Sequence, residues 1–120
     1  MKRVEQQKIN AIVEENFNLA LNQLEQENPR AFCYLNPRQM REAGAVRLRS
    51  ASAYVWETAD FYILQSYETF IACIEKNTDT CFDYLRITYG YTATSAKHVS
   101  MFRKDYGAGK WGCVNEYTAR

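Results

Sequence analysis

The chain has 120 residues and a formal net charge of +1, and 47% of its residues are hydrophobic. This length fits one domain with a real core, and the composition excludes a chain that is disordered throughout. The near-neutral balance also excludes a single dominant charge field, as a strong nucleic-acid binder or an acidic DNA mimic would carry, and it leaves local patches open.

The first predicted element is a long amphipathic helix over residues 3–27, which contain no Gly or Pro. Its apolar residues recur at three- and four-residue steps, which places them on one face. They are Ile9, Ile12, Val13, Phe17, Ala20, Leu21 and Leu24. The helix should end at Asn28, because the residue before Pro29 is pushed out of the α region. At roughly 35 Å it is longer than a small sheet requires. One end therefore overhangs the sheet or packs against a second copy, which leaves a monomer and a homodimer open.

A second, short helix is predicted to begin at Asn36 and Pro37. Asn36 is a good N-cap, Pro suits the first helical position, and Gln39 stands where a capping box requires Glu or Gln. Gly44 is the natural end of this helix. The apolar run before it, residues 31–35, fits either a strand or a buried connector.

Residues 45–59 alternate only in part between apolar and polar side chains, so they predict an edge strand or a strand with an irregular lead-in. Arg47 and Arg49 alternate there with Val46 and Leu48. On the outer face of an edge strand, both arginines would prevent edge-to-edge pairing, and this role stands beside a role in ligand binding.

The centre of the predicted fold is residues 60–107. Residues 61–67, 69–76 and 81–87 are rich in aromatic and β-branched side chains and predict strands. The polar residues 77–80 predict the turn before the last of them.

A turn centred on Thr78 and Asp79 would place Cys73 opposite Tyr84 and Lys76 opposite Cys81. One face of the hairpin would then form the core, and the other face would also be partly apolar. The core face holds Phe70, Ala72, Ile74, Cys81, Leu85 and Ile87, and the other holds Ile71, Cys73, Phe82 and Tyr84. Such a sheet is either covered on both sides or presents an aromatic face to a partner.

The last predicted helix covers residues 95–106, with Thr94 or Ser95 as N-cap and Gly107 as its end. Its apolar stripe consists of Val99, Phe102 and Tyr106. The tail, residues 108–120, holds enough apolar surface that we expect it to dock.

These elements predict an α+β fold in one domain, residues 1–120. It combines the long N-terminal helix (3–27), the short second helix and a sheet-plus-helix core (45–107) with the docked tail (108–120). The core has an antiparallel sheet of three or four strands, with the C-terminal helix packed on the sheet.

Residues that could carry catalysis or bind metal are few. The four cysteines lack paired C-x-x-C spacing and His98 is the single histidine, so we expect no metal, no cofactor and no enzyme. The cysteines are Cys33, Cys73, Cys81 and Cys113, and we expect them to be reduced small hydrophobes. With no signal-peptide core and no membrane-length apolar run, we expect a cytoplasmic protein without a membrane partner.

Charge is sorted along the chain, and the basic stretches supply the candidate binding residues. Residues 57–83 hold six acidic residues and one lysine, whereas residues 86–110 hold five basic residues and one aspartate. Cations there would hold phosphates or acidic side chains, and aromatic rings would stack on bases or bury against a partner. The candidates are Arg47, Arg49, Tyr91, Lys97, Arg103, Lys104, Lys110 and Trp111. The alternative for the helical members is a solvated helix face.

Residues 62–107 resemble a short domain of small proteins from bacteriophages and mobile elements. The resemblance is carried by Ser66-Tyr67-Glu68-Thr69, the hairpin, Lys97-His98 and Phe102 on the last helix, and the closing Tyr106-Gly107. It implies a phage or plasmid context, hence the cytoplasm of a bacterial host, and it implies no catalytic residue.

Two functions remain open from the sequence. The first is a non-enzymatic, phage-derived protein that binds and blocks a host protein or nucleoprotein, an anti-CRISPR being the sharpest version. The alternative is a small nucleic-acid-binding accessory protein or regulator, whose intrinsic affinity would be modest and strongly dependent on salt.

Overall fold

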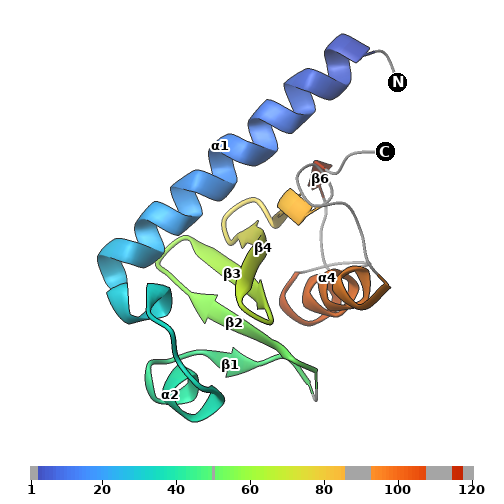
Figure 1. The fold of residues 1–120 in the computed structure, drawn as a ribbon. Helices are drawn as coiled ribbons and strands as arrows, with labels where there is room; N and C mark the ends of the chain where they lie inside the picture. Colours follow the sequence, from blue (N-terminus) through green and yellow to red (C-terminus); the bar gives the residue numbers. More distant parts are fainter. Residues whose placement is uncertain (1–2, 50, 86–92, 108–114, 118–120) are drawn as a thin grey trace.

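The computed structural model describes residues 3–49, 51–85, 93–107 and 115–117, and it has the predicted α+β architecture (Figure 1). Three helical elements come first: α1 (Arg3–Glu27), the 3₁₀ helix η1 (Pro29–Phe32) and α2 (Pro37–Glu42). The strands β1 (Val46–Arg47), β2 (Ala53–Glu57), β3 (Phe61–Ser66), β4 (Thr69–Glu75) and β5 (Thr80–Asp83) follow. The helix α4 (Ala93–Tyr106) and the strand β6 (Asn115–Tyr117) complete the described chain.

The strands form one sheet in the order β1-β2-β3-β4-β5-β6. All pairs from β1 to β5 are antiparallel, and β6 pairs with β5 in parallel. The antiparallel part is larger than the three or four strands expected, because residues 45–59 form two strands instead of one. Their short hairpin leaves β1 at the edge of the sheet.

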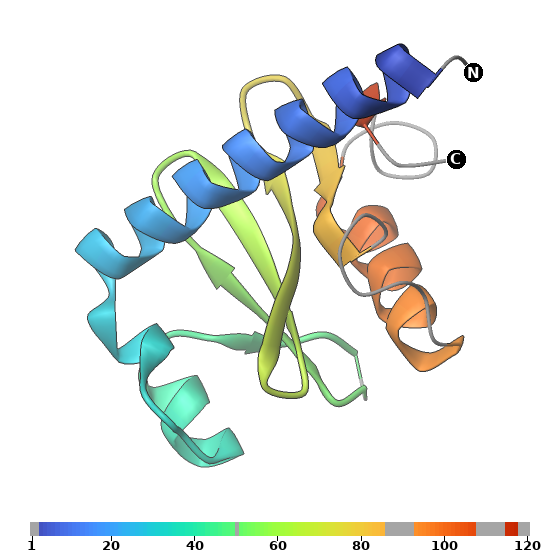
Figure 2. The same cartoon turned by 45° about the horizontal axis from the view of Figure 1, so that its top comes forward.

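The sheet is covered on both faces, which resolves the choice left open by its two partly apolar sides. Trp56, Ile63 and Phe82 belong to the core under α1, whereas Val55 and Leu64 belong to the core under α4. In Figure 2, α1 crosses the near face of the strands and α4 lies on the far side of β5. The protein is therefore a three-layer α/β/α arrangement.

The register of the β4–β5 hairpin differs by two residues from the register that the sequence predicted. Cys73 lies opposite Phe82, and Ile74 opposite Cys81. The expected pair, Cys73 with Tyr84, was wrong by two residues on one strand. A shift of two residues keeps side chains on the same face, because the side-chain period of a strand is two. Cys73 and Cys81 accordingly lie in opposite cores, as predicted.

A β-bulge in β4 corrects the predicted faces of Phe70 and Ile71. The pairing runs from Leu64 with Ala72 directly to Gln65 with Phe70, so Ile71 is the extra residue. An extra residue inverts the alternation on one side of the bulge. Ile71 therefore lies in the core under α4, and Phe70 packs on the opposite face, with the core under α1.

Helix α1 has the bounds predicted from its periodicity, and its N-terminal end extends beyond the sheet (Figure 1). Phe17 is buried and its ring stacks on Tyr84, with the centroids 4.3 Å apart. Ile12, expected on the apolar face, is instead 37% exposed. The other end of α1 is tied to the β2–β3 loop, where the Gln23 amide donates to Asp60 Oδ2 at 2.7 Å.

The second helix follows its capping signals. Asn36 Oδ1 accepts from the Gln39 backbone N–H at 2.9 Å, and Gln39 Oε1 accepts from the Asn36 N–H at 3.0 Å. Gly44 adopts φ +110°, the left-handed conformation that ends helices and favours glycine. The apolar run before α2, residues 31–35, forms no strand. It begins in η1 and continues as a connector that is only partly buried, since Tyr34 is exposed.

The last helix begins earlier than expected. Ala93 is already helical, so Thr94 and Ser95 are inside α4 and are not its N-cap. At the other end, the Gly107 N–H donates to the Arg103 carbonyl at 3.1 Å, as a helix end at Gly107 requires. In the described parts of the chain, no helix combines the length and apolar character needed to cross a membrane.

Candidate functional site

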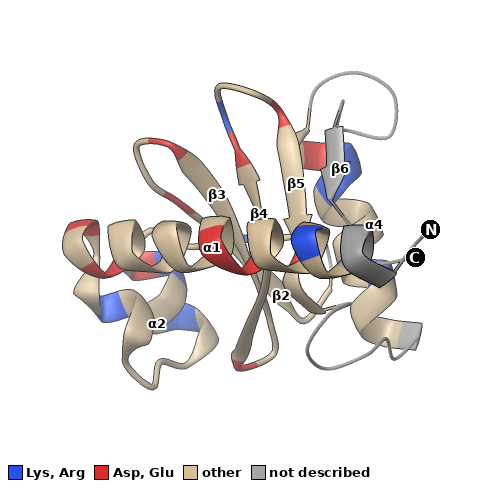
Figure 3. Ribbon diagram, turned by 90° about the horizontal axis from the view of Figure 1, so that it is seen from above, with Lys and Arg blue, Asp and Glu red and all other residues tan. Residues whose placement is uncertain are grey.

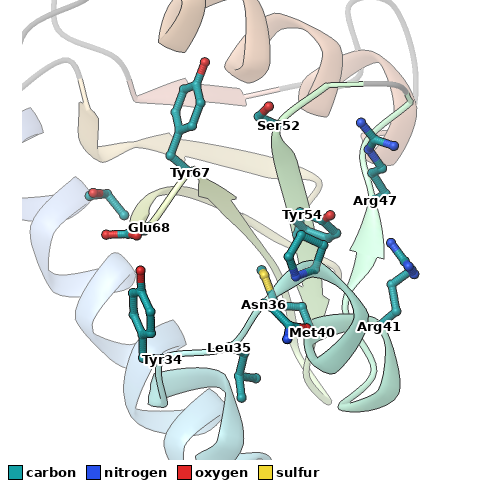
Figure 4. Close-up of a pocket in the computed structure, with 12 residues that line it drawn as sticks. Tyr34, Leu35, Asn36, Met40, Arg41, Arg47, Ser52, Tyr54, Tyr67 and Glu68 are labelled. Atoms are coloured by element: carbon teal, nitrogen blue, oxygen red, sulfur yellow. The ribbon is translucent and has the colours of Figure 1, made fainter.

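A concave surface lies between the connector that leads into α2 and the turn of the β3–β4 hairpin (Figure 4). Its volume is about 740 Å³, within the usual range of ligand sites. We call it the aromatic groove. Its lining consists of Tyr34, Leu35, Asn36, Pro37, Met40, Arg41, Arg47, Ser52, Tyr54, Tyr67, Glu68 and Thr69. A smaller hollow of about 260 Å³ shares Tyr34, Tyr67 and Glu68 with it and adds Phe32, Cys33 and Phe70.

Three exposed aromatic rings gather around this groove and its adjoining hollow. Tyr34 is 88% exposed, Tyr67 58% and Phe32 42%. Among the residues whose side chains are described, 7–49, 51–85 and 94–107, every other aromatic residue is at least half-buried. Exposed apolar surface concentrated at one concave place marks an interaction site more strongly than scattered residues do.

The floor of the groove is apolar and built by the fold. Met40 on α2 and Tyr54 on β2 are both buried, at 5% and 7% exposure, in the core under α1. Leu35 packs partly against the same core. The backbone under the floor is held in place, because the capping box fixes the start of α2 and the Ala45 N–H donates to the Met40 carbonyl at 2.9 Å.

Tyr67 is held at the rim in a strained backbone conformation. It is the first residue of the two-residue connection between β3 and β4, and its φ is +55°. A bulky residue with positive φ costs on the order of 1–3 kcal/mol and persists only where the surroundings fix it. Here the Tyr67 N–H donates to the Ser52 carbonyl at 3.0 Å, and the Tyr67 carbonyl accepts from the Gln65 amide at 3.1 Å.

Beneath Tyr67 lies a buried pair formed by Ser66 and His98. Ser66 Oγ and His98 Nδ1 are 2.7 Å apart, and the two residues are 4% and 3% exposed. The His98 ring also contacts the Tyr67 ring, with centroids 5.8 Å apart. Burial lowers the pKa of His98. Although serine beside histidine could serve nucleophilic catalysis, this pair lies in neither the groove nor the hollow, so a substrate in either would not reach it.

The groove has charges of opposite sign on its two sides. Arg41 and Arg47 stand on one side, and Glu68 stands on the other beside Tyr34 (Figure 4). The Arg47 Nε donates to the Ala51 carbonyl at 3.1 Å, which anchors that guanidinium. In Figure 3, basic segments lie on α2 and acidic segments at the β2–β3 loop, whereas the β4–β5 loop carries both signs.

The structure separates the binding residues that the sequence proposed. Arg47 lines the groove, whereas Arg49, two residues later, turns to α4. There it forms a bidentate pair with Asp105, from Nε to Oδ2 at 2.9 Å and from Nη2 to Oδ1 at 2.7 Å. These bonds raise the pKa of Arg49 and hold the pKa of Asp105 below its ordinary value.

The remaining candidates do not reach the groove or cannot be placed. Lys97, Arg103 and Lys104 belong to α4, which covers the opposite face of the sheet from the groove floor. Tyr91, Lys110 and Trp111 lie outside the described residues. The proposed surface is therefore not one patch in the described part of the chain.

Sequence reasoning missed Tyr34 and Arg41 as binding candidates and treated Tyr67 only as part of a strand. Tyr34 lies in a run assigned to a strand or connector, and nothing local indicates that the ring is exposed. Tyr67 gave one signal, because it sits in the Ser-Tyr-x-Thr element of the resemblance. In the described ranges, no three residues of the types His, Cys, Asp and Glu are placed to hold a metal ion.

The fold and site define a small α+β protein with one aromatic groove in its described part and no metal cluster there. Comparison of the chain with protein-family models, with curated proteins and with solved structures found no match.

Proposed function

We propose that this protein is a non-enzymatic binding protein that blocks a host protein or nucleoprotein by engaging it through the aromatic groove. The observation that carries the proposal is the gathering of Phe32, Tyr34 and Tyr67 around one apolar-floored groove. Tyrosines at the centre of interfaces contribute a large share of binding energy, because they bury area at low cost in side-chain entropy.

The lining of the groove favours binding over catalysis. Its titratable side chains are tyrosines, two arginines and Glu68, and Ser52 has no histidine beside it in the lining. Acyl or phosphoryl transfer needs a nucleophile next to a base or a metal. The strain at Tyr67 supports a role for its ring in binding, since such strain concentrates at functional sites.

The blocking role and the phage origin rest on the resemblance of residues 62–107 to small phage proteins. A protein of 120 residues that acts by occupying a surface of its partner needs no active site. The most specific form of this proposal is an anti-CRISPR protein in the cytoplasm of a bacterial host.

The second candidate is a nucleic-acid-binding accessory protein or regulator. The observation that favours it is the presence of Arg41 and Arg47 in the same groove as Tyr34 and Tyr67. Bases stack on tyrosine rings while arginines hold phosphates, which is the usual arrangement for single strands.

Capture from a bacterial host lysate tests the first candidate with three baits: the wild type, a Tyr34→Ala/Tyr67→Asn double variant and a Lys97→Ala control. We expect a specific partner on the wild type and the control, and its loss on the groove variant. Capture that is equal on all three baits would rule out the groove as the binding surface.

Binding of labelled random-sequence DNA and RNA in a salt series tests the second candidate. Affinity that falls steeply with salt and disappears in an Arg41→Glu/Arg47→Glu variant would favour nucleic acid. Absence of binding at low salt would eliminate it.

A further inference from the structure

We propose that the aromatic groove takes a short segment of a partner protein that carries one apolar anchor side chain and, on the side of Arg41 and Arg47, a carboxylate. This inference rests on the proposed function and specifies the chemistry of its partner. Its parts are the apolar floor, the two tyrosine rims and the asymmetric charge of the groove.

The floor selects an aliphatic or aromatic anchor. Leu35, Met40 and Tyr54 line it, and Met40 and Tyr54 are almost fully buried. A methionine floor adapts its shape to different apolar side chains, because the thioether chain is unbranched and flexible. Burial of such an anchor from water contributes about 1.5–3 kcal/mol.

The rims extend contact along a segment rather than a single group. Tyr34 rises from the connector before α2 and Tyr67 from the β3–β4 turn, on separate walls of the groove (Figure 4). The adjoining hollow continues past both rings to Phe70, which packs on Phe32 with centroids 5.2 Å apart. This elongated, ring-lined path fits an extended chain, whose alternate side chains point into successive pockets.

The charges give the segment its direction. Arg41 is exposed and its side chain makes no hydrogen bond or ion pair with the residues that the structure describes. Arg47 is anchored nearby through its bond to the Ala51 carbonyl. A carboxylate on the segment would be attracted to these two cations and repelled by Glu68 on the other side, so only one orientation satisfies both.

The same features favour a protein segment over a nucleic acid. Two cations in the groove are few for a phosphate backbone, which carries a charge at every nucleotide, and Glu68 would repel it. The leucine and methionine of the floor match aliphatic side chains, whereas stacking of bases requires flat aromatic platforms.

Hydrogen bonds within the protein hold three parts of the groove wall, and such restraint reduces the entropic cost of association. The capping box fixes α2, the Ser52 carbonyl fixes Tyr67, and the Ala51 carbonyl fixes Arg47. We therefore expect a peptide to bind without the rest of its protein.

Selection from a display library of random peptides of about twelve residues tests the inference. On the wild type, we expect enriched peptides that share an aliphatic or aromatic residue close to Asp or Glu. On an Arg41→Glu/Arg47→Glu variant, the enriched peptides should carry Lys or Arg in place of the acid. A Lys8→Glu/Lys97→Glu variant is the matched control, since it reverses two exposed charges away from the groove and should select the acidic peptides.

Synthetic peptides from the wild-type selection then give the affinity. We expect a loss of about tenfold or more with Tyr34→Ala and with the Arg41→Glu/Arg47→Glu variant, and no loss with the control. Tyr34 is 88% exposed, so its removal should leave the fold intact, as circular dichroism would verify.

Three results would overturn the inference: enriched peptides without acidic residues, peptides indifferent to Tyr34→Ala, or no enrichment at all. If lysate capture still depends on Tyr34 and Tyr67 in those cases, the groove binds a folded surface or a nucleic acid and the binding role survives. If capture is indifferent to them as well, both proposals fall.

Discussion

Ser66 Oγ lies 2.7 Å from His98 Nδ1, and this buried contact joins the end of β3 to α4. Ser66 directly precedes Tyr67 in the chain, and the ring of His98 contacts the ring of Tyr67. The pair therefore supports one rim of the aromatic groove from below. The hydrogen bond satisfies two polar groups that would otherwise be costly to bury.

The burial of His98 makes the free energy of unfolding depend on pH. Burial lowers the pKa of His98 from its ordinary value of 6.5, so the unfolded chain binds a proton more readily than the folded protein. Where the unfolded state binds more protons, the free energy of unfolding falls as pH falls. We expect it to be greatest above about pH 6.5 and to decrease towards about pH 5, as urea denaturation at a series of pH values would measure.

His98→Gln is the control for this prediction, and its free energy of unfolding should change less over the same range. Asp105 does not interfere, because Arg49 holds its pKa below the ordinary 3.8 and its contribution is lost only in stronger acid. A wild-type slope equal to that of His98→Gln would show that His98 does not titrate differently on folding.

Tyr67→Asn should separate binding from stability. Asn tolerates positive φ better than Tyr, so the relief of strain offsets the lost ring contact with His98. We expect the free energy of unfolding to change by less than about 1 kcal/mol, while capture of the partner is lost. A destabilisation above about 2 kcal/mol in urea would mean that the Tyr67 ring serves the fold.

Phe17→Ala tests how α1 is held on the sheet. Phe17 is 2% exposed and stacked on Tyr84, so its removal leaves a cavity and should cost about 3–5 kcal/mol in urea denaturation. Leu19→Ala is the matched control on the same helix, because Leu19 is 53% exposed, and it should change stability by less than about 0.5 kcal/mol. Equal effects would contradict the assigned face of α1.

The cysteines should differ sharply in reactivity. Burial raises the pKa of the Cys73 thiol far above its ordinary value, and Cys81 is fully buried as well, whereas Cys33 is exposed. Because the thiolate is the reactive form, a thiol reagent should modify Cys33 quickly and the two buried thiols only on unfolding. A Cys113→Ser background limits the count to Cys33, Cys73 and Cys81. Rapid modification of more than one thiol in the native protein would contradict the burial of Cys73 and Cys81.

Much of the fold could be predicted because its signals are local. The bounds of α1, the capping box of Asn36 and Gln39, and the end at Gly44 each depend on residues within a few positions of one another. Cys73 and Cys81 were correctly predicted to lie on opposite faces of the sheet although the predicted register was wrong. The reason is again local, because the alternation of side chains is a property of each strand.

Most of the candidate site could not be predicted from the sequence. The bulge at Ile71 moves Phe70 to the groove side, and it is visible only in how β4 pairs with β3. Arg47 and Arg49 look equivalent in the chain, yet one lines the groove and the other pairs with Asp105 on α4. Their separation depends on where α4 packs, which no local pattern encodes.

The α+β class, the extent of the long helix and the apolar character of both sheet faces can be read from the sequence, because periodicity and capping act over neighbouring residues. Tertiary packing is what covers both faces of the sheet and places Tyr34 and Tyr67 on the walls of one groove. Those two tyrosines come from different loops. Loops are placed by strand register, bulges and helix docking, so their meeting is a property of the whole fold.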